Sequence, residues 1–389
     1  MYHKKTSIAF VIESLGSGGA ERQLIELVKN LNKEQYLIRV MTFTPSDFYL
    51  PELQDSNTPT IILNRRGRWD LKPVLKLVQW LKSGEVDIVH SYLNTANLYA
   101  VLAGKIAKRG MIIVSERCSE KHYTRLQAFY RYWAYSHADV IIANSQAARK
   151  ELISRNNLHG KDVLFISNAI DMNKFIPIDS DTRLLLRQKL RWSLNKRIVL
   201  TVASFKYQKN HLGMVNAIAG LDLVETAFNF CWAGSQTPRQ IFMDVKQRID
   251  DLNLDRIIHF LPPQENVIDL YHACDILLLN SLWEGTPNVV LEAMACGCPV
   301  IATDVGDVGR YVIPGVTGWL IPPNDPKALR DALESASRLS EQELRAMGAS
   351  GRQHLLHLKM ASSDMAHCYE NVYARLQFNK YSAKSSSIE

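Results

Sequence analysis

The chain has 389 residues, which is too long for one ordinary hydrophobic core and favours two domains. Hydrophobic residues make up 47% of the chain and charged residues 22%, a composition that excludes a largely disordered protein. The formal net charge is +7, and all of it lies in residues 1–180, which hold 24 Lys and Arg against 17 Asp and Glu. No apolar stretch approaches the roughly 18 residues that a membrane span needs, so we expect a soluble or peripheral protein.

The first half alternates short apolar runs with helical patterns. The runs are apolar throughout, which is typical of parallel strands that are buried on both faces. The first run ends at Glu13 and is too short for a signal peptide, so we interpret it as a strand. Strands are predicted at 8–12, 37–42, 60–63, 88–90, 112–115, 140–143 and 163–166, and helices at 20–31, 73–82, 96–108, 125–136 and 145–156.

The same α/β order begins again after a predicted linker at 167–194. Strands are predicted at 198–203, 228–233, 257–260, 276–279, 299–302 and 318–321, and a last helix carries one apolar stripe before a frayed tail. We therefore expect two doubly wound domains, at 1–175 and 176–360, followed by a C-terminal helical segment at 361–389. The linker contains Asp179-Ser180-Asp181, which has the form of a metal-binding D-x-D motif but does not follow a strand. We expect it to be solvated.

The segment from Trp283 to Gly297 predicts an anion-binding helix N-terminus. Thr286 suits the N-cap position and Pro287 the first helical position, because proline has no N–H to lose there. The amides of Asn288 and Val289, together with the positive end of the helix dipole, then form a site for a diphosphate.

Two carboxylates flank this predicted phosphate site. Glu292 lies on the same helix face about one turn deeper, within reach of a ribose attached to the phosphates. Glu284 and Gly285 lie in the loop before the helix, where a sugar on the other side of the phosphates would sit. The arrangement indicates a nucleotide-sugar site.

This segment resembles the glutamate pair of retaining glycosyltransferases of family 4, among the group 1 glycosyl transferases. The resemblance covers almost the whole chain and implies the GT-B architecture, in which two Rossmann-like doubly wound domains face each other across a cleft. It further implies that the first domain binds the acceptor, that the second binds the nucleotide sugar, and that the final helix crosses back to the first domain. Bacterial enzymes of capsule, O-antigen and exopolysaccharide synthesis are of this kind.

The loop after residue 202 resembles the phosphate-binding loop of the family. Relatives place Gly-Arg where this chain has Ala203-Ser204, and a lysine where it has Lys209. Lys206 is a candidate for the missing cation. A lysine against the diphosphate leaving group stabilises the charge that develops as the glycosidic bond breaks. The resemblance thus makes Lys209 and Glu284 catalytic candidates, and Leu261 matches where the family backbone meets the base.

Three features of the first half resemble the acceptor side of the family. Gly18 and Gly19 lie in a glycine-rich turn, where a backbone without side chains can approach a ligand closely. His90 corresponds to a strand-end histidine that lines the cleft, although a lone histidine is as often structural. Arg117 follows the stretch where many relatives place a histidine near the reacting carbon, and it suits a phosphate or carboxylate of the acceptor.

The charge and the cysteines add expectations about partners and location. Basic clusters lie at 65–68, 105–109 and 117–131, with aromatic residues such as Trp69 and Tyr123 nearby. They fit an anionic membrane surface or an anionic acceptor, but solvated surface helices would show the same pattern. No nucleic-acid-binding signature accompanies them, so we expect no nucleic-acid partner. Six scattered cysteines without a repeated C-x-x-C pair indicate a reducing compartment, and we expect Cys296 and Cys298 to be buried residues and not metal ligands.

The site residues and the family resemblance together predict a hexosyltransferase that is metal-independent and needs no cofactor, and the resemblance implies that it retains the anomeric configuration. Its expected donor is a nucleoside diphosphate sugar, with a UDP-sugar favoured over a GDP-sugar, and its expected acceptor is a hydroxyl of a glycan or lipid-linked glycan. We expect a cytoplasmic protein, on the cytoplasmic face of the membrane if it is peripheral. Two alternatives remain open, a sugar-nucleotide epimerase of GT-B fold and a catalytically silent subunit that binds a sugar nucleotide.

Overall fold

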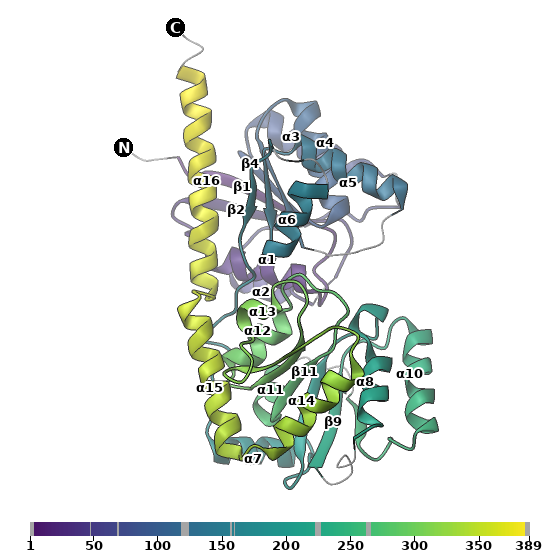
Figure 1. Cartoon of the computed structure of the whole chain (residues 1–389). Helices are drawn as coiled ribbons and strands as arrows, with labels where there is room; N and C mark the ends of the chain where they lie inside the picture. Colours follow the sequence, from purple (N-terminus) through teal and green to yellow (C-terminus); the bar gives the residue numbers. More distant parts are fainter. Residues whose placement is uncertain are drawn as a thin grey trace. The chain divides into compact units, whose positions relative to one another are not determined.

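The computed structural model describes residues 4–46, 48–67, 70–117, 124–155, 158, 160–221, 227–261 and 266–385. The chain forms two compact units (Figure 1). Unit 1 comprises residues 1–169 and 362–389, and unit 2 comprises residues 170–361. The units therefore divide at 169 and 361, a few residues from the boundaries that the sequence pattern suggests at 175 and 360.

Unit 1 is built on a parallel sheet that, within its described residues, has seven strands in the order β3-β2-β1-β4-β5-β6-β7. The order reverses between β1 and β4, which is the mark of a doubly wound sheet. The predicted strands are confirmed to within two residues at each end. Their bounds are β1 Thr6–Ile12, β2 Tyr36–Thr42, β3 Thr60–Ile62, β4 Ile88–Tyr92, β5 Met111–Glu116, β6 Val140–Ala143 and β7 Val163–Phe165.

Helices cover both faces of this sheet, and each face has its own apolar cluster. The last helix belongs to unit 1, where it packs beside α1 and contributes Met365, Tyr369 and Tyr373 to the core. The helices are α1 Gly19–Asn30, α2 Leu50–Asp55, α3 Lys72–Ser83, α4 Asn94–Ala107, α5 Arg125–His137, α6 Gln146–Arg155 and α16 Ser362–Ser385.

Unit 2 repeats this architecture with a parallel sheet in the order β10-β9-β8-β11-β12-β13 among its described residues. Its order reverses between β8 and β11. The strands are β8 Arg197–Val202, β9 Phe228–Ala233, β10 Ile258–Leu261, β11 Ile276–Leu279, β12 Val300–Thr303 and β13 Gly318–Ile321. The helices are α7 Ser180–Lys189, the 3-10 turn η1 Tyr207–Lys209, α8 His211–Ile218, α10 Arg239–Asp251, α11 Ile268–Ala273, α12 Asn288–Ala295, α13 Val308–Tyr311, α14 Pro326–Arg338 and α15 Glu341–His357.

The predicted linker at 167–194 is wrong in part, because α7 lies inside it. Asp179 caps this helix by accepting a hydrogen bond from the amide of Thr182 at 2.8 Å, so the D-x-D segment is a helix start. Arg183 and Arg187 then form ion pairs with Asp275, next to β11. The polar composition that suggested a linker therefore belongs to a helix that salt bridges hold to unit 2.

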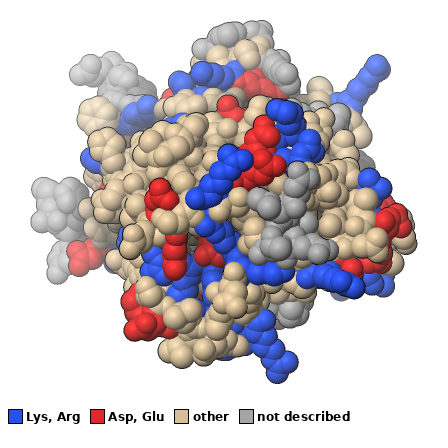
Figure 2. All heavy atoms as spheres, turned by 60° about the horizontal axis from the view of Figure 1, so that its bottom comes forward, with Lys and Arg blue, Asp and Glu red and all other residues tan. Residues whose placement is uncertain are grey.

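The surface charges and the helix lengths are relevant to whether the chain contacts a membrane. On the face shown in Figure 2, Lys and Arg are interspersed with Asp and Glu. None of the helices in the described part of the chain combines the length and the apolarity needed to cross a membrane. Of the predicted basic and aromatic clusters, Arg68, Trp69, Lys121 and Tyr123 lie outside the described residues.

Candidate functional site

The candidate site of unit 2 lies where the strand order of its sheet reverses. The loop after β8 carries η1 and Lys209, and the loop after the neighbouring strand β11 carries Glu284. The connections that follow the parallel strands on either side of such a switch point run to opposite faces of the sheet and leave room for a ligand between the loops. The fold therefore brings together two predicted residues that are 75 positions apart.

Backbone and side-chain hydrogen bonds join the two loops. The amide of Leu282 donates to the carbonyl oxygen of Gln208 at 2.8 Å, and Nε2 of Gln208 donates to the carbonyl oxygen of Trp283 at 2.7 Å. Lys209 Nζ lies 2.5 Å from Oε1 of Glu284, and Ser281 Oγ donates to the same oxygen at 2.7 Å. Because the loops hold each other, the ammonium and the carboxylate are positioned before any ligand arrives.

The Lys209–Glu284 pair is mostly shielded from water. The Lys209 side chain is 18% exposed and that of Glu284 is 9% exposed. An ion pair in such surroundings is screened less than a surface pair, and removing one partner leaves a charge without compensation. The pair therefore offers an incoming ligand both a cation for phosphate oxygens and an acceptor for hydroxyl groups.

Gly306 supports the loop that carries Glu284. It has a φ of +60°, and a Cβ at this position would lie 2.4 Å from the carbonyl oxygen of Glu284 and 2.3 Å from that of Gly285. The amide of Asp307 donates to the carbonyl oxygen of Gly285 at 3.0 Å. Only glycine allows this close approach, so the loop after β12 fixes the backbone around Glu284.

The predicted start of the phosphate-binding helix is wrong by one residue. The N-cap of α12 is Pro287, with extended backbone, and the helix begins at Asn288, whereas the sequence pattern placed the cap at Thr286. Proline has no side-chain oxygen and makes no capping hydrogen bond in the described structure. Thr286 is buried in the loop just before the cap. Asn288 and Val289 remain in the first turn, at the positive end of the helix dipole.

Glu292 lies on α12 as predicted, and its carboxylate is held from α11. The side chain is 3% exposed, and Oε2 accepts a hydrogen bond from the hydroxyl of Tyr271 at 2.6 Å. Tyr271 is itself buried in the core of unit 2. This contact restricts the rotamer of Glu292. The sequence analysis missed Tyr271, whose only local signal is an aromatic residue on an otherwise apolar helix face.

The other predicted donor-binding residues lie around the same loops. Ser204 follows β8 and is half-buried, whereas Lys206 is exposed and precedes η1. Leu261 is the last residue of β10, beyond β9. The amide of Lys209 donates to the carbonyl oxygen of Lys206 at 2.9 Å, but no contact of the Lys206 ammonium with Glu284 or Lys209 is described. Its predicted role as a second phosphate cation therefore stays a prediction.

His211 is a further residue of this region that the sequence analysis missed. It is the first residue of α8, 2% exposed, and stacked on Phe205 at 4.3 Å between ring centroids. Neither ring nitrogen has a hydrogen-bond partner among the described residues. Burial, with a smaller contribution from Lys209, lowers the pKa of His211 to about 3. The ring is therefore neutral at physiological pH.

In unit 1, the prediction that His90 lines a cleft is wrong. Its side chain is fully buried, with Nδ1 2.8 Å from the hydroxyl of Tyr373 and Nε2 2.9 Å from Oγ of Ser115. Burial, followed by the nearby charge of Arg117, keeps the pKa of His90 well below its usual range. Both ring nitrogens are used inside the core, so His90 is a structural histidine that links β4 to α16.

Arg117 lies directly after β5 and the glycine-rich turn lies directly before α1, as the sequence pattern predicts. Arg117 follows β5, donates to Oδ1 of Asn168 at 2.9 Å and to the hydroxyl of Tyr369, and lies over the ring of Tyr92. Gly18 is the N-cap of α1, which begins at Gly19. A Cβ on Gly18 would lie 2.1 Å from the Glu21 carboxylate. The roles of these residues toward an acceptor stay predictions.

Two family models match the chain and together cover most of both units. Residues 17–174 match the model described as Glycosyltransferase Family 4, and residues 182–354 match the model described as Glycosyl transferases group 1. The second match includes Lys209, Glu284 and Glu292.

A curated relative and two solved structures extend these matches. The relative is the GalNAc-alpha-(1->4)-GalNAc-alpha-(1->3)-diNAcBac-PP-undecaprenol alpha-1,4-N-acetyl-D-galactosaminyltransferase of Campylobacter jejuni, 27% identical over 339 residues that cover 84% of this chain and 88% of the relative. A glycosyltransferase structure from Rickettsia africae superposes with a TM-score of 0.83 at 20% identity, covering 96% of this chain and 99% of that one.

The Anabaena protein HepE, solved in complex with UDP-glucose, gives the same TM-score of 0.83 at 22% identity and covers 95% of this chain and 99% of its own. These superpositions show the GT-B fold, with its two parallel sheets and flanking helices. The family matches, the fold and the paired carboxylates of unit 2 agree, and the chain belongs to the group 1 glycosyltransferases.

Proposed function

We propose that this glycosyltransferase moves a hexose from a nucleoside diphosphate sugar to a hydroxyl of a lipid-linked glycan, with retention of the anomeric configuration and without a metal. The observation that carries the proposal is the contact between Lys209 and Glu284. Glu284 lies in the loop just before α12, and α12 carries Glu292. A cation, a helix N-terminus and two carboxylates match the parts of the donor, which are a diphosphate, a sugar and a ribose.

Each side chain takes one part of the donor. Lys209 and the first turn of α12, with Asn288 and Val289, would bind the diphosphate. Glu284 would accept hydrogen bonds from sugar hydroxyls, and Glu292, oriented by Tyr271, would accept them from the ribose. Ser204, Gly285, Thr286 and Pro287 would line the phosphate and sugar positions, and Leu261 would lie against the base.

The proposed transfer needs no protein base. The bond between the anomeric carbon and the β-phosphate oxygen breaks, the acceptor oxygen bonds to the same face of the sugar, and the acceptor proton passes to the leaving phosphate. Negative charge grows on the diphosphate as its bond to the sugar breaks, and Lys209 stabilises that charge more in the transition state than in the ground state. A positioned ammonium supplies this stabilisation without a metal.

The relatives support a choice of donor and acceptor. HepE binds UDP-glucose in its solved complex, and the Campylobacter enzyme is named for an acceptor on undecaprenyl diphosphate. We therefore favour a UDP-sugar donor and an acceptor linked through a diphosphate to a lipid. The excess of Lys and Arg in residues 1–180 fits an anionic acceptor and an anionic membrane surface.

Thermal-shift screening of the purified chain against UDP-sugars and GDP-sugars tests the donor site. A ligand at about 100 times its Kd adds roughly 2.7 kcal/mol to the stability of the protein that it binds, so a true donor gives a clear rise in Tm. Product analysis by NMR, with and without a lipid-linked acceptor, then tests the reaction. A sugar or sugar nucleotide with an inverted stereocentre, formed without an acceptor, would favour an epimerase, and binding without any turnover would favour a silent subunit.

A further inference from the structure

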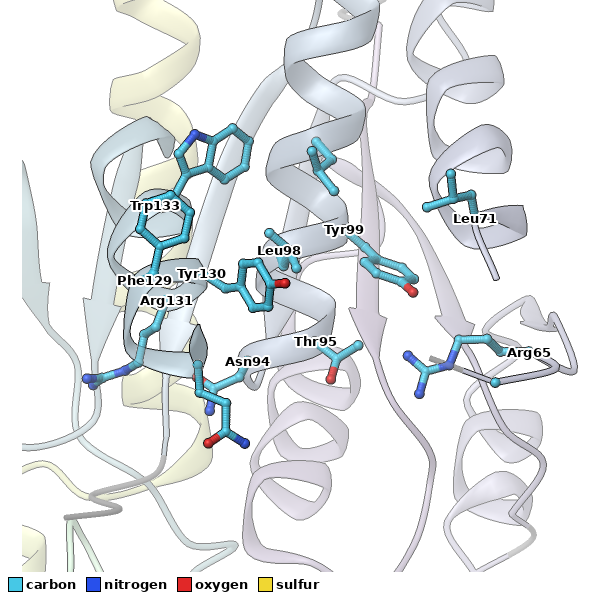
Figure 3. A pocket seen from close by; sticks show the side chains of 13 residues that line it. Arg65, Leu71, Asn94, Thr95, Leu98, Tyr99, Phe129, Tyr130, Arg131 and Trp133 are labelled. Carbon is cyan, nitrogen blue, oxygen red and sulfur yellow. The ribbon is translucent and has the colours of Figure 1, made fainter. Parts of the chain in front are cut away.

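Unit 1 contains a cavity of about 710 Å³ that the donor site does not use. Figure 3 shows that Leu98 and Tyr99 of α4 lie between Tyr130 of α5 and Leu71 at the start of α3. The volume lies within the roughly 300–1,000 Å³ that small-molecule sites occupy. The apolar and aromatic wall is formed by Leu71, Leu98, Tyr99, Leu102, Tyr130 and Trp133.

The rim of this cavity exposes large apolar side chains. Leu71 at the start of α3 is 55% exposed and Phe129 of α5 is 60% exposed, and both line the cavity. Leu75 and Leu126, on the same two helices, are 64% and 49% exposed. Among the residues of α5, only Ala134 and Tyr135 are buried. Apolar side chains that gather around a hollow on an otherwise polar surface mark a binding site.

One end of the cavity is polar. Arg65, Asn94 and Thr95 lie toward the same end in Figure 3. The Arg65 guanidinium forms an ion pair with Glu13 at 3.1 Å and lies over the Tyr99 ring at 5.8 Å, and these contacts hold it in place. Asn94 and Thr95 belong to the first turn of α4. The cavity is therefore amphipathic along its length.

We propose that this cavity binds the hydrocarbon chain of a lipid diphosphate, with the diphosphate at the end formed by Arg65, Asn94 and Thr95. The inference rests on the proposed function, in which the acceptor is lipid-linked, and it assigns that lipid a site. Contact between the hydrocarbon chain and the apolar wall removes apolar surface of both from water, which favours binding. A free glycan would instead need hydrogen-bonding side chains along the wall, but Leu71, Leu98 and Leu102 offer none. The hydroxyl of Tyr99 already donates to the carbonyl oxygen of Asp70 at 3.2 Å.

Titration calorimetry with farnesyl diphosphate tests the inference on the full chain. Inorganic pyrophosphate and farnesol serve as separate titrants, since each carries one half of the probe. We expect farnesyl diphosphate to bind at least about tenfold more tightly than either half, because both ends of the cavity are then used. Equal affinity for farnesyl diphosphate and pyrophosphate would show that the apolar wall takes no part and would overturn the proposal.

Substitutions on α4 test whether the hydrocarbon chain of the lipid binds in this cavity. Leu98→Trp fills the cavity and stays apolar, and Leu98→Asp places a charge in the wall. Ile106→Asp is the matched control, because Ile106 is 54% exposed on the same helix and does not line the cavity. We expect both Leu98 variants to weaken farnesyl diphosphate binding about tenfold or more, and the control to leave it unchanged. Unchanged binding in Leu98→Trp would place the lipid elsewhere.

The donor assay separates this inference from the proposed function. The Tm rise with the UDP-sugar that stabilises the wild type should persist in both Leu98 variants, since their site is in unit 1. If no nucleotide sugar stabilises the wild type but farnesyl diphosphate still binds in the Leu98-dependent manner, the proposed function fails and the lipid site stands. If the protein binds the donor and transfers sugar but does not bind farnesyl diphosphate, the lipid site is wrong and the proposed function stands.

Discussion

The hydroxyl of Tyr271 donates a hydrogen bond to Oε2 of Glu292 at 2.6 Å, and both side chains are buried in unit 2. The contact joins α11 to the helix whose first turn faces the proposed diphosphate. Glu292 is thereby held in one rotamer. If Glu292 binds the ribose as we propose, a carboxylate that is already oriented would lose less conformational entropy on binding.

Glu292→Gln should weaken nucleotide binding. The substitution keeps the shape of the side chain but removes the charge that strengthens its hydrogen bonds, and a bond of this type is worth about 1.5–3 kcal/mol. Titration calorimetry with UDP measures the loss of affinity. Unchanged affinity in a variant with wild-type Tm would remove Glu292 from the site.

Tyr271→Phe should weaken nucleotide binding less than Glu292→Gln does. It removes only the hydroxyl that orients the carboxylate, and Glu292 remains to contact the ribose. A double-mutant cycle on UDP binding checks this relation, because the effect of Tyr271→Phe should vanish once Glu292 is changed. Strictly additive losses would show that the two residues act independently.

Lys209→Ala should lower kcat by about two orders of magnitude and change KM for the donor much less. This outcome is expected because the ammonium stabilises mainly the charge that develops on the diphosphate in the transition state. The variant also leaves Glu284 without its cation. Steady-state kinetics with the donor identified by thermal shift separates kcat from KM. A change in KM alone would make Lys209 a ground-state binder.

EDTA provides the complementary measurement on the wild-type enzyme. Since Lys209 and the α12 N-terminus are proposed to neutralise the diphosphate, chelation should leave the rate unchanged. Activity that EDTA abolishes and Mg²⁺ or Mn²⁺ restores would replace the metal-free proposal.

The buried His211 should make the protein lose stability in acid. Its pKa is about 3 in the folded state and about 6.5 in the unfolded state, so between these values the unfolded chain binds the extra proton. Stability therefore falls as pH drops from 6.5 toward 3. His211→Phe keeps a ring against Phe205 and removes this proton, so its unfolding free energy should depend less steeply on pH.

Urea unfolding at a series of pH values between 4 and 7 checks the His211 prediction. His90 has a lowered pKa as well and contributes a slope of the same sign, so the variant should retain part of the pH dependence. Identical slopes for the wild type and His211→Phe would mean that His211 is already protonated in the folded protein over this range.

Unit 1 should bind anionic vesicles in a salt-sensitive way. Arg66, Lys72 and Arg125 are exposed, and each lies within two positions in sequence of a residue that lines the apolar cavity. Changing all three to Ser should weaken sedimentation with anionic vesicles, since each basic residue near such a surface contributes about 1 kcal/mol within a Debye length of roughly 10 Å.

The control for the membrane prediction changes Lys246, Lys327 and Arg338 of unit 2 to Ser, which removes the same charge from a different unit. This control should sediment like the wild type across the salt series. Equal sedimentation with neutral and anionic vesicles, or equal losses in the two triple variants, would contradict docking through unit 1.

Local sequence patterns suffice to predict the strands of two parallel sheets and the segment that carries Glu284 and Glu292. Runs such as Ile276–Leu279 are apolar throughout, and the helix from Asn288 begins after a proline, so periodicity and local backbone chemistry suffice to place them. These signals act over a few residues and need no knowledge of which strands are neighbours. The cap itself was placed one residue early, at Thr286, because threonine is the better N-cap in general.

Which of these residues come into contact depends on the three-dimensional packing of the strands and helices. Lys209 and Glu284 are 75 positions apart and touch because β8 and β11 are neighbours at the point where the strand order reverses. His90 is structural because its Nδ1 shares a hydrogen bond with the hydroxyl of Tyr373, 283 positions away, in the core of unit 1. Strand order and the docking of a distant helix depend on long-range packing, which leaves no periodic trace in the residues themselves.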